Sequence, residues 1–260
     1  MIALYCTNAM PLTAIVRAVP PTQPPVVSCD WQQFERIAGH ADCSIIAMQW
    51  LAVESGADRI IYLKAKQPRR PIVLVTAKDA DNLRLLRAVI VEEVVWWHEI
   101  ERTIWATVCR ATLASEMNRI ATAIRMTTCI PPQLRNALAN ACESATPVTT
   151  TSELAKLAGC HRRTLWYQWR KVTDSDTSAR LEDVLSWILL LRAVALRSAG
   201  DSWAVVACSL HIHQHTLARL TKQHLGLTVR EVSSQADTVT SALVHRLMSS
   251  TVGEAYCHIS

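Results

Sequence analysis

The sequence predicts an α/β domain with a doubly wound parallel sheet, followed by an all-α domain with two helix-turn-helix units. Two observations carry this prediction. Between residues 25 and 110, short apolar runs alternate with amphipathic stretches, which is typical of βαβ architecture. Between residues 151 and 235, a short helical pattern, a turn and a more polar helical pattern occur twice, on either side of a long apolar helix.

Length and composition favour a cytoplasmic protein of two domains. The chain has 260 residues, of which 50% are hydrophobic, so each half can bury a core. No uninterrupted apolar run approaches the roughly 18 residues that a membrane span needs, so we expect no membrane association. The 9 cysteines are odd in number and never form a CxxC pair, which favours reduced thiols over a disulfide framework.

The α/β domain is expected over residues 25–110. Its strands are predicted at Val26–Cys29, Cys43–Ala47, Ile72–Thr76 and Glu93–Trp97, with helices at Trp31–Gly39, Leu51–Lys66, Asp81–Ile90 and Glu99–Cys109. Residues 1–24 are expected to be a lead-in that ends in a Pro-rich joint. Residues 111–150 are expected to form a helical linker interrupted at Pro131 and Pro132, and residues 236–260 a C-terminal tail.

The first helix-turn-helix unit is predicted to begin beside Thr150. Thr150 and Glu153 have the spacing of a capping box, Gly159 supplies the turn, and Leu165 and Trp169 form the apolar stripe of the second helix. The side chains left on the other faces are basic or aromatic, and these types suit base edges and phosphates. They are Arg162, Arg163, Trp166, Tyr167 and Arg170. A solvated basic helix whose two aromatic residues pack on a neighbour is the alternative.

The second unit is predicted between Trp203 and Gly226. Leu210 to Ile212 form its turn, Leu217 and Leu220 hold its second helix inward, and Gly226 ends that helix. The side chains predicted to face a DNA groove are Gln214, His215, Arg219 and Lys222, with Ala218 among them. Gln and Arg are the types that make paired contacts to adenine and guanine.

The apolar helix between the units has helical spacing from Leu181 to Leu196 and a Gly stop at Gly200. Residues 152–232 resemble the AraC/XylS family of bacterial transcription regulators. The segments that carry the resemblance are ELAKLAG..RRTLWYQWRK, RLEDVLSWILLLRAVAL and SWAVVACSL....TLARLTKQHLGLTVREV. The resemblance implies two helix-turn-helix subdomains that enter successive major grooves of double-stranded DNA. It places Arg163, Trp166 and Tyr167 against bases in the first subdomain, and Gln214, His215 and Arg219 in the second.

The second turn departs from the family pattern. Leu210 and His211 stand where the family usually has a Gly and an aromatic residue, and Val229 stands where it usually has Pro. Leu210 would be strained if the turn needs a positive φ at that position.

The N-terminal domain resembles a response-regulator receiver domain. VVSCDW matches its first strand, CSIIAM the third, PIVLVTAK the fourth with Thr76 at the signalling hydroxyl, and EVVWWH the fifth. The phosphoacceptor position falls on Ala47 or Met48, and the lysine position on Trp97 or His98. Of the acids that hold Mg²⁺ only Asp30 is left, and a helix cap is its simpler interpretation. We therefore expect no phosphorylation.

This pseudo-receiver is expected to serve dimerisation or another form of regulation. Trp96, Trp97 and Trp105 are candidates for an interface, or else ordinary core aromatics. No catalytic motif is present, so we expect no enzyme, no cofactor and no metal, although His211, His213 and His215 alternate. The favoured function is a sequence-specific transcription regulator that binds double-stranded DNA, and a homodimer is an arrangement that the sequence leaves open. The alternative is an interaction module that binds another regulator.

Overall fold

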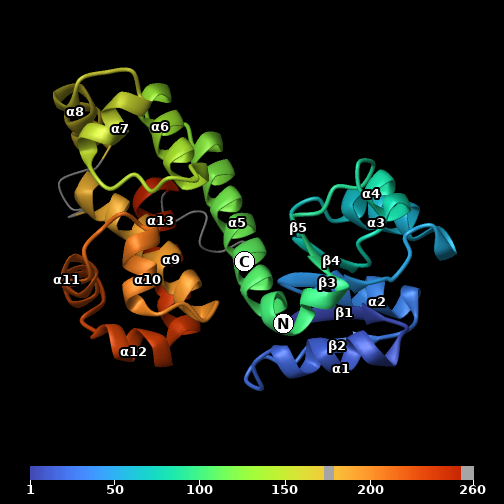
Figure 1. Cartoon of the computed structure of the whole chain (residues 1–260). Coiled ribbons are helices and arrows are strands. Elements are labelled where there is room, and N and C mark those ends of the chain that lie inside the picture. The colour runs from blue at the N-terminus through green and yellow to red at the C-terminus, as the bar shows by residue number, and fades with distance from the viewer. Residues whose placement is uncertain (173–178, 253–260) are drawn as a thin grey trace. The chain divides into compact units, whose positions relative to one another are not determined.

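The computed structural model describes residues 1–172 and 179–252, and it divides into two compact units, Met1–Ser115 and Glu116–Ser260. Each unit is described by itself. Unit 1 is an α/β unit and unit 2 is helical (Figure 1). Helix α5 (Ile100–Met126) begins in unit 1 and ends in unit 2. Among the described residues, no helix is both long enough and apolar enough to cross a membrane.

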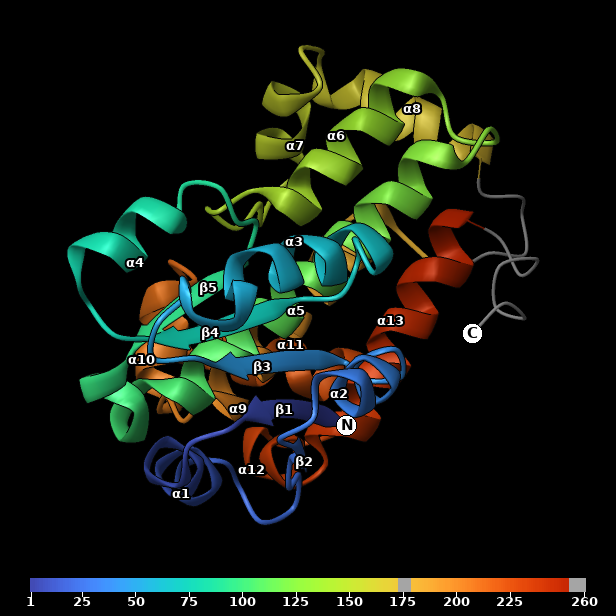
Figure 2. The same cartoon turned by 90° about the vertical axis from the view of Figure 1, so that its right-hand side faces the viewer.

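Unit 1 is built on a five-stranded sheet with the order β2-β1-β3-β4-β5, in which all neighbouring strands are parallel (Figure 2). In the register, Leu4 lies opposite Ile45, and Val75 lies opposite Val95. The strands are β1 (Ile2–Cys6), β2 (Val26–Ser28), β3 (Cys43–Ala47), β4 (Ile72–Thr76) and β5 (Glu93–Trp96). The predicted α/β class is therefore confirmed.

The first strand lies earlier in the chain than the sequence pattern indicated. β1 and helix α1 (Ala9–Ala18) occupy residues expected to be only a lead-in, and β1 pairs with both β2 and β3. The prediction of a lead-in over residues 1–24 is therefore wrong, and VVSCDW contains the second strand. All five residues of β1 are buried, because a strand with a neighbour on each side and a helix over each face is surrounded by apolar atoms.

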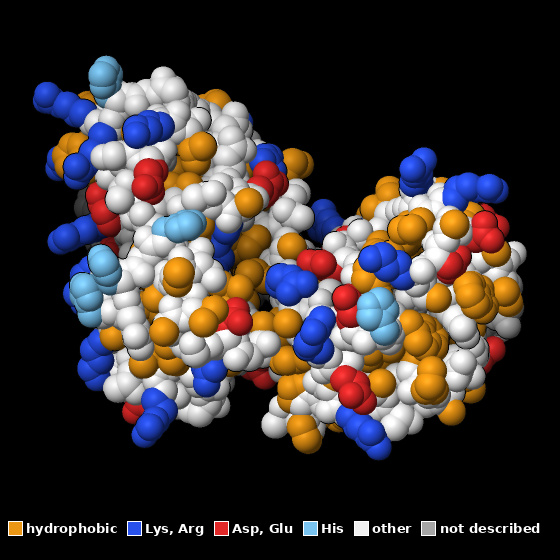
Figure 3. Space-filling view, in the orientation of Figure 1, with side chains coloured by type: hydrophobic (Ala, Val, Ile, Leu, Met, Phe, Trp, Pro, Cys, Tyr) orange, Lys and Arg blue, Asp and Glu red, His pale blue; other side chains and the backbone are white. Residues whose placement is uncertain are grey.

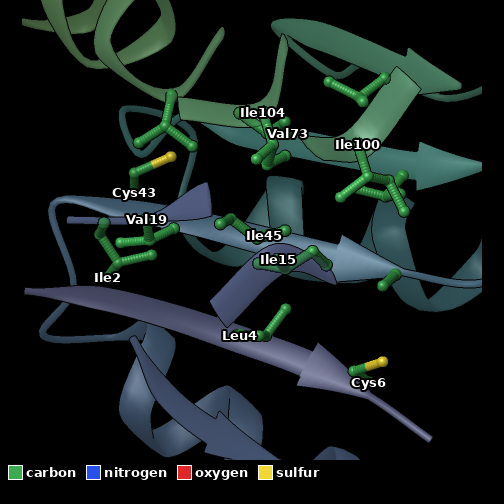
Figure 4. Packing of buried hydrophobic residues seen from close by; sticks show 14 of the residues in the cluster. Ile2, Leu4, Cys6, Ile15, Val19, Cys43, Ile45, Val73, Ile100 and Ile104 are labelled. Atoms are coloured by element: carbon green, nitrogen blue, oxygen red, sulfur yellow. The ribbon is translucent and has the colours of Figure 1, made fainter. Parts of the chain in front are cut away.

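Helices cover both faces of the sheet. α1 and the first turns of α5 pack on one face, where Ile15, Ile45 and Ile104 are fully buried (Figure 4). α2 (Trp31–Ala38) and α3 (Gly56–Lys66) pack on the other, around Phe34 and Ile60. A short helix, α4 (Ala80–Leu85), follows β4, and two 3₁₀ turns lie at Val53–Ser55 and Trp97–Glu99.

The predicted interface tryptophans are half-buried. Trp97 and Trp105 pack against the core cluster that joins α1, α5 and the sheet. The Trp96 ring lies 5.8 Å from the Lys78 ammonium group, a cation–π arrangement. Packing against the core accounts for Trp97 and Trp105 without a partner chain.

Unit 2 is organised around α9, which has ten buried residues in eighteen. Such extensive burial is expected of a helix that is apolar nearly all round. α9 packs against helices that precede it and helices that follow it. The helices after α5 are α6 (Pro132–Glu143), α7 (Thr151–Leu157), α8 (Arg162–Val172), α9 (Leu181–Ser198), α10 (Trp203–Ser209), α11 (Gln214–Leu225), α12 (Val229–Ser234) and α13 (Ala236–Val252).

Two boundaries of this region differ from the prediction. α6 begins at Pro132, in agreement with the expected interruption, but it packs on α7 and α8 and is therefore part of the first helix-turn-helix unit, not of a linker. The segment expected as a tail contains α13, which packs along α9. Val239, Leu243 and Leu247, four residues apart, are almost fully buried. Residues 253–260 of the expected tail lie outside the described residues.

Candidate nucleic-acid interface

The second helix-turn-helix unit repeats the first at a constant interval of 52 residues. Thr150 caps α7 and Ser202 caps α10, each through a side-chain oxygen that accepts a backbone N–H. The capping box predicted at Thr150 and Glu153 is confirmed. α7 and α10 have seven residues each, and α8 and α11 begin at Arg162 and Gln214. α6 and α9 pack against these pairs, so each unit contains three helices.

The two turns have the same backbone geometry. Gly159 has φ 61° and His211 has φ 54°, and each is the second residue after the first helix. The N–H of Gly159 donates to the Lys156 carbonyl at 3.1 Å, and that of His211 donates to the Cys208 carbonyl at 3.0 Å. The second turn does not require a positive φ at Leu210, so the strain expected under that condition is absent. Leu210 has φ −89° and a buried side chain, and His211 takes the left-handed conformation.

The second helix of each unit, α8 and α11, has a buried stripe and an exposed face. Leu165 and Trp169 are buried in α8, and their counterparts Leu217 and Thr221 are buried in α11. Residues spaced by four and then three positions share one side of a helix. Arg163, Tyr167 and Arg170 therefore lie together on α8, away from its buried stripe, and His215, Arg219 and Lys222 do the same on α11.

All nine side chains predicted to contact DNA are exposed. The 52-residue repeat arranges these nine side chains and Ala218 in five pairs: Arg162 with Gln214, Arg163 with His215, Trp166 with Ala218, Tyr167 with Arg219, and Arg170 with Lys222. We call the first members of these pairs the α8 reading face and the second members the α11 reading face. Figure 3 shows Lys, Arg and His side chains along the edge of unit 2 formed by α8 and α11.

Neighbouring side chains hold several of these groups in place. On α8, the Arg170 guanidinium lies 5.3 Å from the Trp166 ring, and the Lys171 ammonium lies 5.0 Å from the Tyr167 ring. On α11, Arg219 donates to the Gln223 side chain at 3.2 Å. Lys171 and Gln223 were not predicted from the sequence. They are 52 residues apart, and each is four residues after a predicted contact, which is the signal that could have identified them.

Half-buried contacts join α9 to α11 and to the end of α6. His224 of α11 lies 4.0 Å from the Asp183 carboxylate and edge-on to the Trp187 ring. Burial lowers the pKa of His224, and Asp183 opposes this effect. Arg192 of α9 donates to the carbonyls of Cys142 at 2.8 Å and Ser144 at 2.6 Å, and so caps the end of α6. α9 thus joins the two helix-turn-helix units.

In unit 1, the carboxyl edge of the sheet is closed by a buried amide. Asn82 is 1% exposed. Its amide group donates to the Gln49 carbonyl at 2.8 Å and to the Thr76 hydroxyl at 3.0 Å, and its oxygen accepts the Leu51 N–H at 2.9 Å. The Thr76 hydroxyl is therefore buried in a network that ties the ends of β3 and β4 together.

The acidic group expected at this edge is a helix cap. Asp30 accepts the Gln33 N–H at 2.7 Å at the start of α2, as its simpler interpretation required. Ala47 and Met48, where the receiver resemblance would place a phosphoacceptor, are apolar and buried. Within the described residues, no three His, Cys, Asp or Glu side chains form a group that could hold a metal ion. In unit 2, the imidazole rings of His213 and His215 stack, with their centroids 5.3 Å apart.

Comparison with known proteins gives no match. No protein-family model matches the sequence, and neither the curated proteins nor the solved structures contain a match to it. The interpretation of the α8 and α11 reading faces therefore depends on their own geometry and chemistry.

Proposed function

We propose that this chain is a sequence-specific regulator of transcription that binds double-stranded DNA through its two helix-turn-helix units. The observation that carries the proposal is the 52-residue repeat, because it presents two equivalent helices with exposed contact groups at the same positions. In helix-turn-helix proteins the N-terminal residues of the second helix contact base edges. Two such helices in one chain are also what the resemblance to the AraC/XylS family implies.

The chemistry of the reading faces supports this proposal. Arg163 and Arg219 have the planar fork that binds guanine in two places, and Gln214 has the amide that binds adenine in the same manner. Arg170 and Lys222 lie farther along their helices and suit phosphate oxygens, which hold a protein in register without reading the sequence. α9 has eighteen residues, about 27 Å at 1.5 Å per residue. That length suits two reading helices in successive major-groove segments.

A second candidate function is an interaction module that binds another regulator. Trp166 and Tyr167 are 52% and 58% exposed, and these residue types are enriched where protein surfaces meet. We give this function second place because the same face carries three arginines, and because the α11 reading face has the same geometry without any aromatic residue.

We further propose that unit 1 is a receiver-like scaffold that is not phosphorylated. Its strand order is that of a common class of doubly wound sheets, to which receivers belong. The buried Asn82 and Thr76 occupy the edge where a receiver holds its acidic groups. The role that we assign to this unit is regulation, through a partner or through a second copy of the chain.

Selection of binding sites from random DNA tests the proposed function. We expect a motif in two halves, about one helical turn apart from centre to centre. Arg163→Ala should relax the sequence of one half, and Arg219→Ala that of the other. Each should weaken binding to the selected site by about 1–3 kcal/mol. Arg17→Ala, which removes an exposed charge from α1, is the control and should leave the motif unchanged.

Two results would contradict this assignment. Equal losses on selected and random DNA for Arg163→Ala would show that Arg163 contacts phosphate and not a base. A motif that both variants relax in the same half would show that the two reading faces do not act separately. The absence of any enriched motif would favour the interaction module.

A further inference from the structure

A pocket opens at the α8 reading face. Its volume is about 370 Å³, which is within the range of small-molecule sites. Three helices contribute to it: α7, α8 and α9. Its lining residues are Thr151, Arg162, Arg163, Trp166, Leu181 and Glu182.

One wall of the pocket is a small polar side chain. Thr151 is only 7% exposed and lines the pocket. A hydroxyl group can both donate and accept hydrogen bonds, so Thr151 can bind a polar group of a ligand.

The charges around the pocket favour an anion on one side. Arg162 and Arg163 are the first two residues of α8, so their guanidinium groups add to the positive end of an eleven-residue helix. On the other side, Glu182 and Asp183 in the first turn of α9 offset the positive end of that helix. A phosphate group therefore fits the arginine side, and donor groups fit the Glu182 side, because an ionised carboxylate only accepts hydrogen bonds.

The apolar part of the pocket suits a flat ring. Trp166 is 52% exposed, and its ring is held by the cation–π contact with Arg170. Nucleotide bases stack on exposed aromatic rings of this kind. Leu181, which is 2% exposed, adds a buried apolar group to the lining.

The second helix-turn-helix unit provides an internal comparison. The counterpart of Thr151 is Trp203, a half-buried side chain with the Arg197 guanidinium 6.0 Å from its ring. The counterpart of Trp166 is Ala218. The second unit thus has a large side chain where the first has a small one, and it lacks the exposed ring. The features of the pocket belong to the first unit alone.

We propose that this pocket binds a nucleoside monophosphate, with the phosphate at Arg162 and Arg163 and the base against Trp166. Guanine suits the Glu182 carboxylate because the Watson–Crick edge of guanine has adjacent N–H donors. The bound nucleotide competes with DNA, since the three residues of the α8 reading face that it uses are then occupied. That competition rests on the proposed function, whereas nucleotide binding itself does not.

Calorimetric titration of the full chain with GMP, in the absence of DNA, tests the proposal. We expect saturable binding of one GMP per chain, and weaker binding of both guanosine and inorganic phosphate. Thr151→Trp places the side chain of the second unit in the pocket and should weaken GMP binding at least about tenfold. Trp166→Ala should weaken it by about tenfold through lost stacking. Circular dichroism checks that each variant is folded.

Arg219→Ala is the matched control, because it removes an arginine from the α11 reading face. It should lower the affinity for DNA and leave the affinity for GMP unchanged. If the chain binds GMP but no specific DNA, the proposed function is wrong and nucleotide binding in the pocket is supported. If GMP binds without displacing DNA from the wild-type chain, the competition is overturned.

Three results would contradict the proposal that the pocket binds a nucleotide. The first is the absence of saturable GMP binding in a chain that binds duplex DNA, which would assign the same chemistry to a DNA phosphate. The second is equal affinity for GMP and for guanosine, or for GMP and inorganic phosphate. Either equality would show that the phosphate contact or the base contact adds nothing to the affinity. The third is unchanged GMP affinity in both folded variants, Thr151→Trp and Trp166→Ala.

Discussion

At the scale of single residues, Asn82 is the side chain on which the carboxyl edge of unit 1 most depends. Its amide satisfies the carbonyls of Gln49 and Ala77 and the hydroxyl of Thr76, and its oxygen satisfies the Leu51 N–H. These groups come from two separate parts of the chain, the segment that follows β3 and the end of β4. One buried amide therefore ties the ends of β3 and β4 together.

Asn82→Leu should lower the free energy of unfolding of unit 1 by about 2–4 kcal/mol, because it leaves several buried polar groups without partners. Urea unfolding measures this change. Asn136→Leu, at an exposed position of α6, is the control and should be close to neutral. An Asn82→Leu variant as stable as the wild type would show that the network contributes nothing to folding.

At the scale of secondary-structure elements, the two turns differ in one residue that matters. Both need a positive φ, and the first has Gly159 there whereas the second has His211. A side chain with a Cβ atom is strained in this conformation. The second turn is therefore less favourable than the first, although both have the same hydrogen bonds.

His211→Gly should raise the free energy of unfolding of unit 2 by about 0.5–1 kcal/mol, since glycine adopts this φ without strain. Thermal or urea unfolding of the full chain provides the measurement. The same change at His245, an exposed position within α13, should have the opposite sign because glycine weakens a helix interior. A destabilised His211→Gly variant would contradict the backbone geometry of the second turn.

Helix α13 is a structural part of unit 2. Leu243 is fully buried where α13 packs along α9. Leu243→Ala should lower the free energy of unfolding by about 2–5 kcal/mol through lost burial and a cavity. Ser241→Ala, on the exposed side of the same helix, should change it by less than about 0.5 kcal/mol. Similar, small effects of the two substitutions on urea unfolding would indicate that α13 is not docked.

At the scale of the whole molecule, the sequence predicted those elements whose patterns are strong. β3, β4 and β5 are apolar runs bounded by polar residues, and α7 has a capping box, so all four were located. β1 was missed because its short apolar run opens the chain, without a turn signal before it. α13 was missed because polar residues interrupt its apolar pattern: Thr240 and Ser241 lie between Val239 and Leu243, and His245 and Arg246 lie between Leu243 and Leu247.

The candidate site was predictable for a related reason. Exposed groups on a helix follow from the positions of its buried stripe, so Leu165 and Leu217 were enough to orient both reading faces. The conformation of the second turn was not predictable, because its left-handed residue is a histidine. The pocket was not predictable either, since it depends on how Thr151, Trp166 and Leu181 from three helices meet.

The most direct test of the proposed function is the affinity of the purified chain for its selected DNA site and for a scrambled duplex, each at two salt concentrations. We expect the selected site to bind at least about a thousandfold more tightly, and added salt to weaken both affinities while a large ratio persists. Equal affinities for the two duplexes, falling together as salt is added, would contradict it. Such a result would show that the basic reading faces attract DNA without reading its sequence.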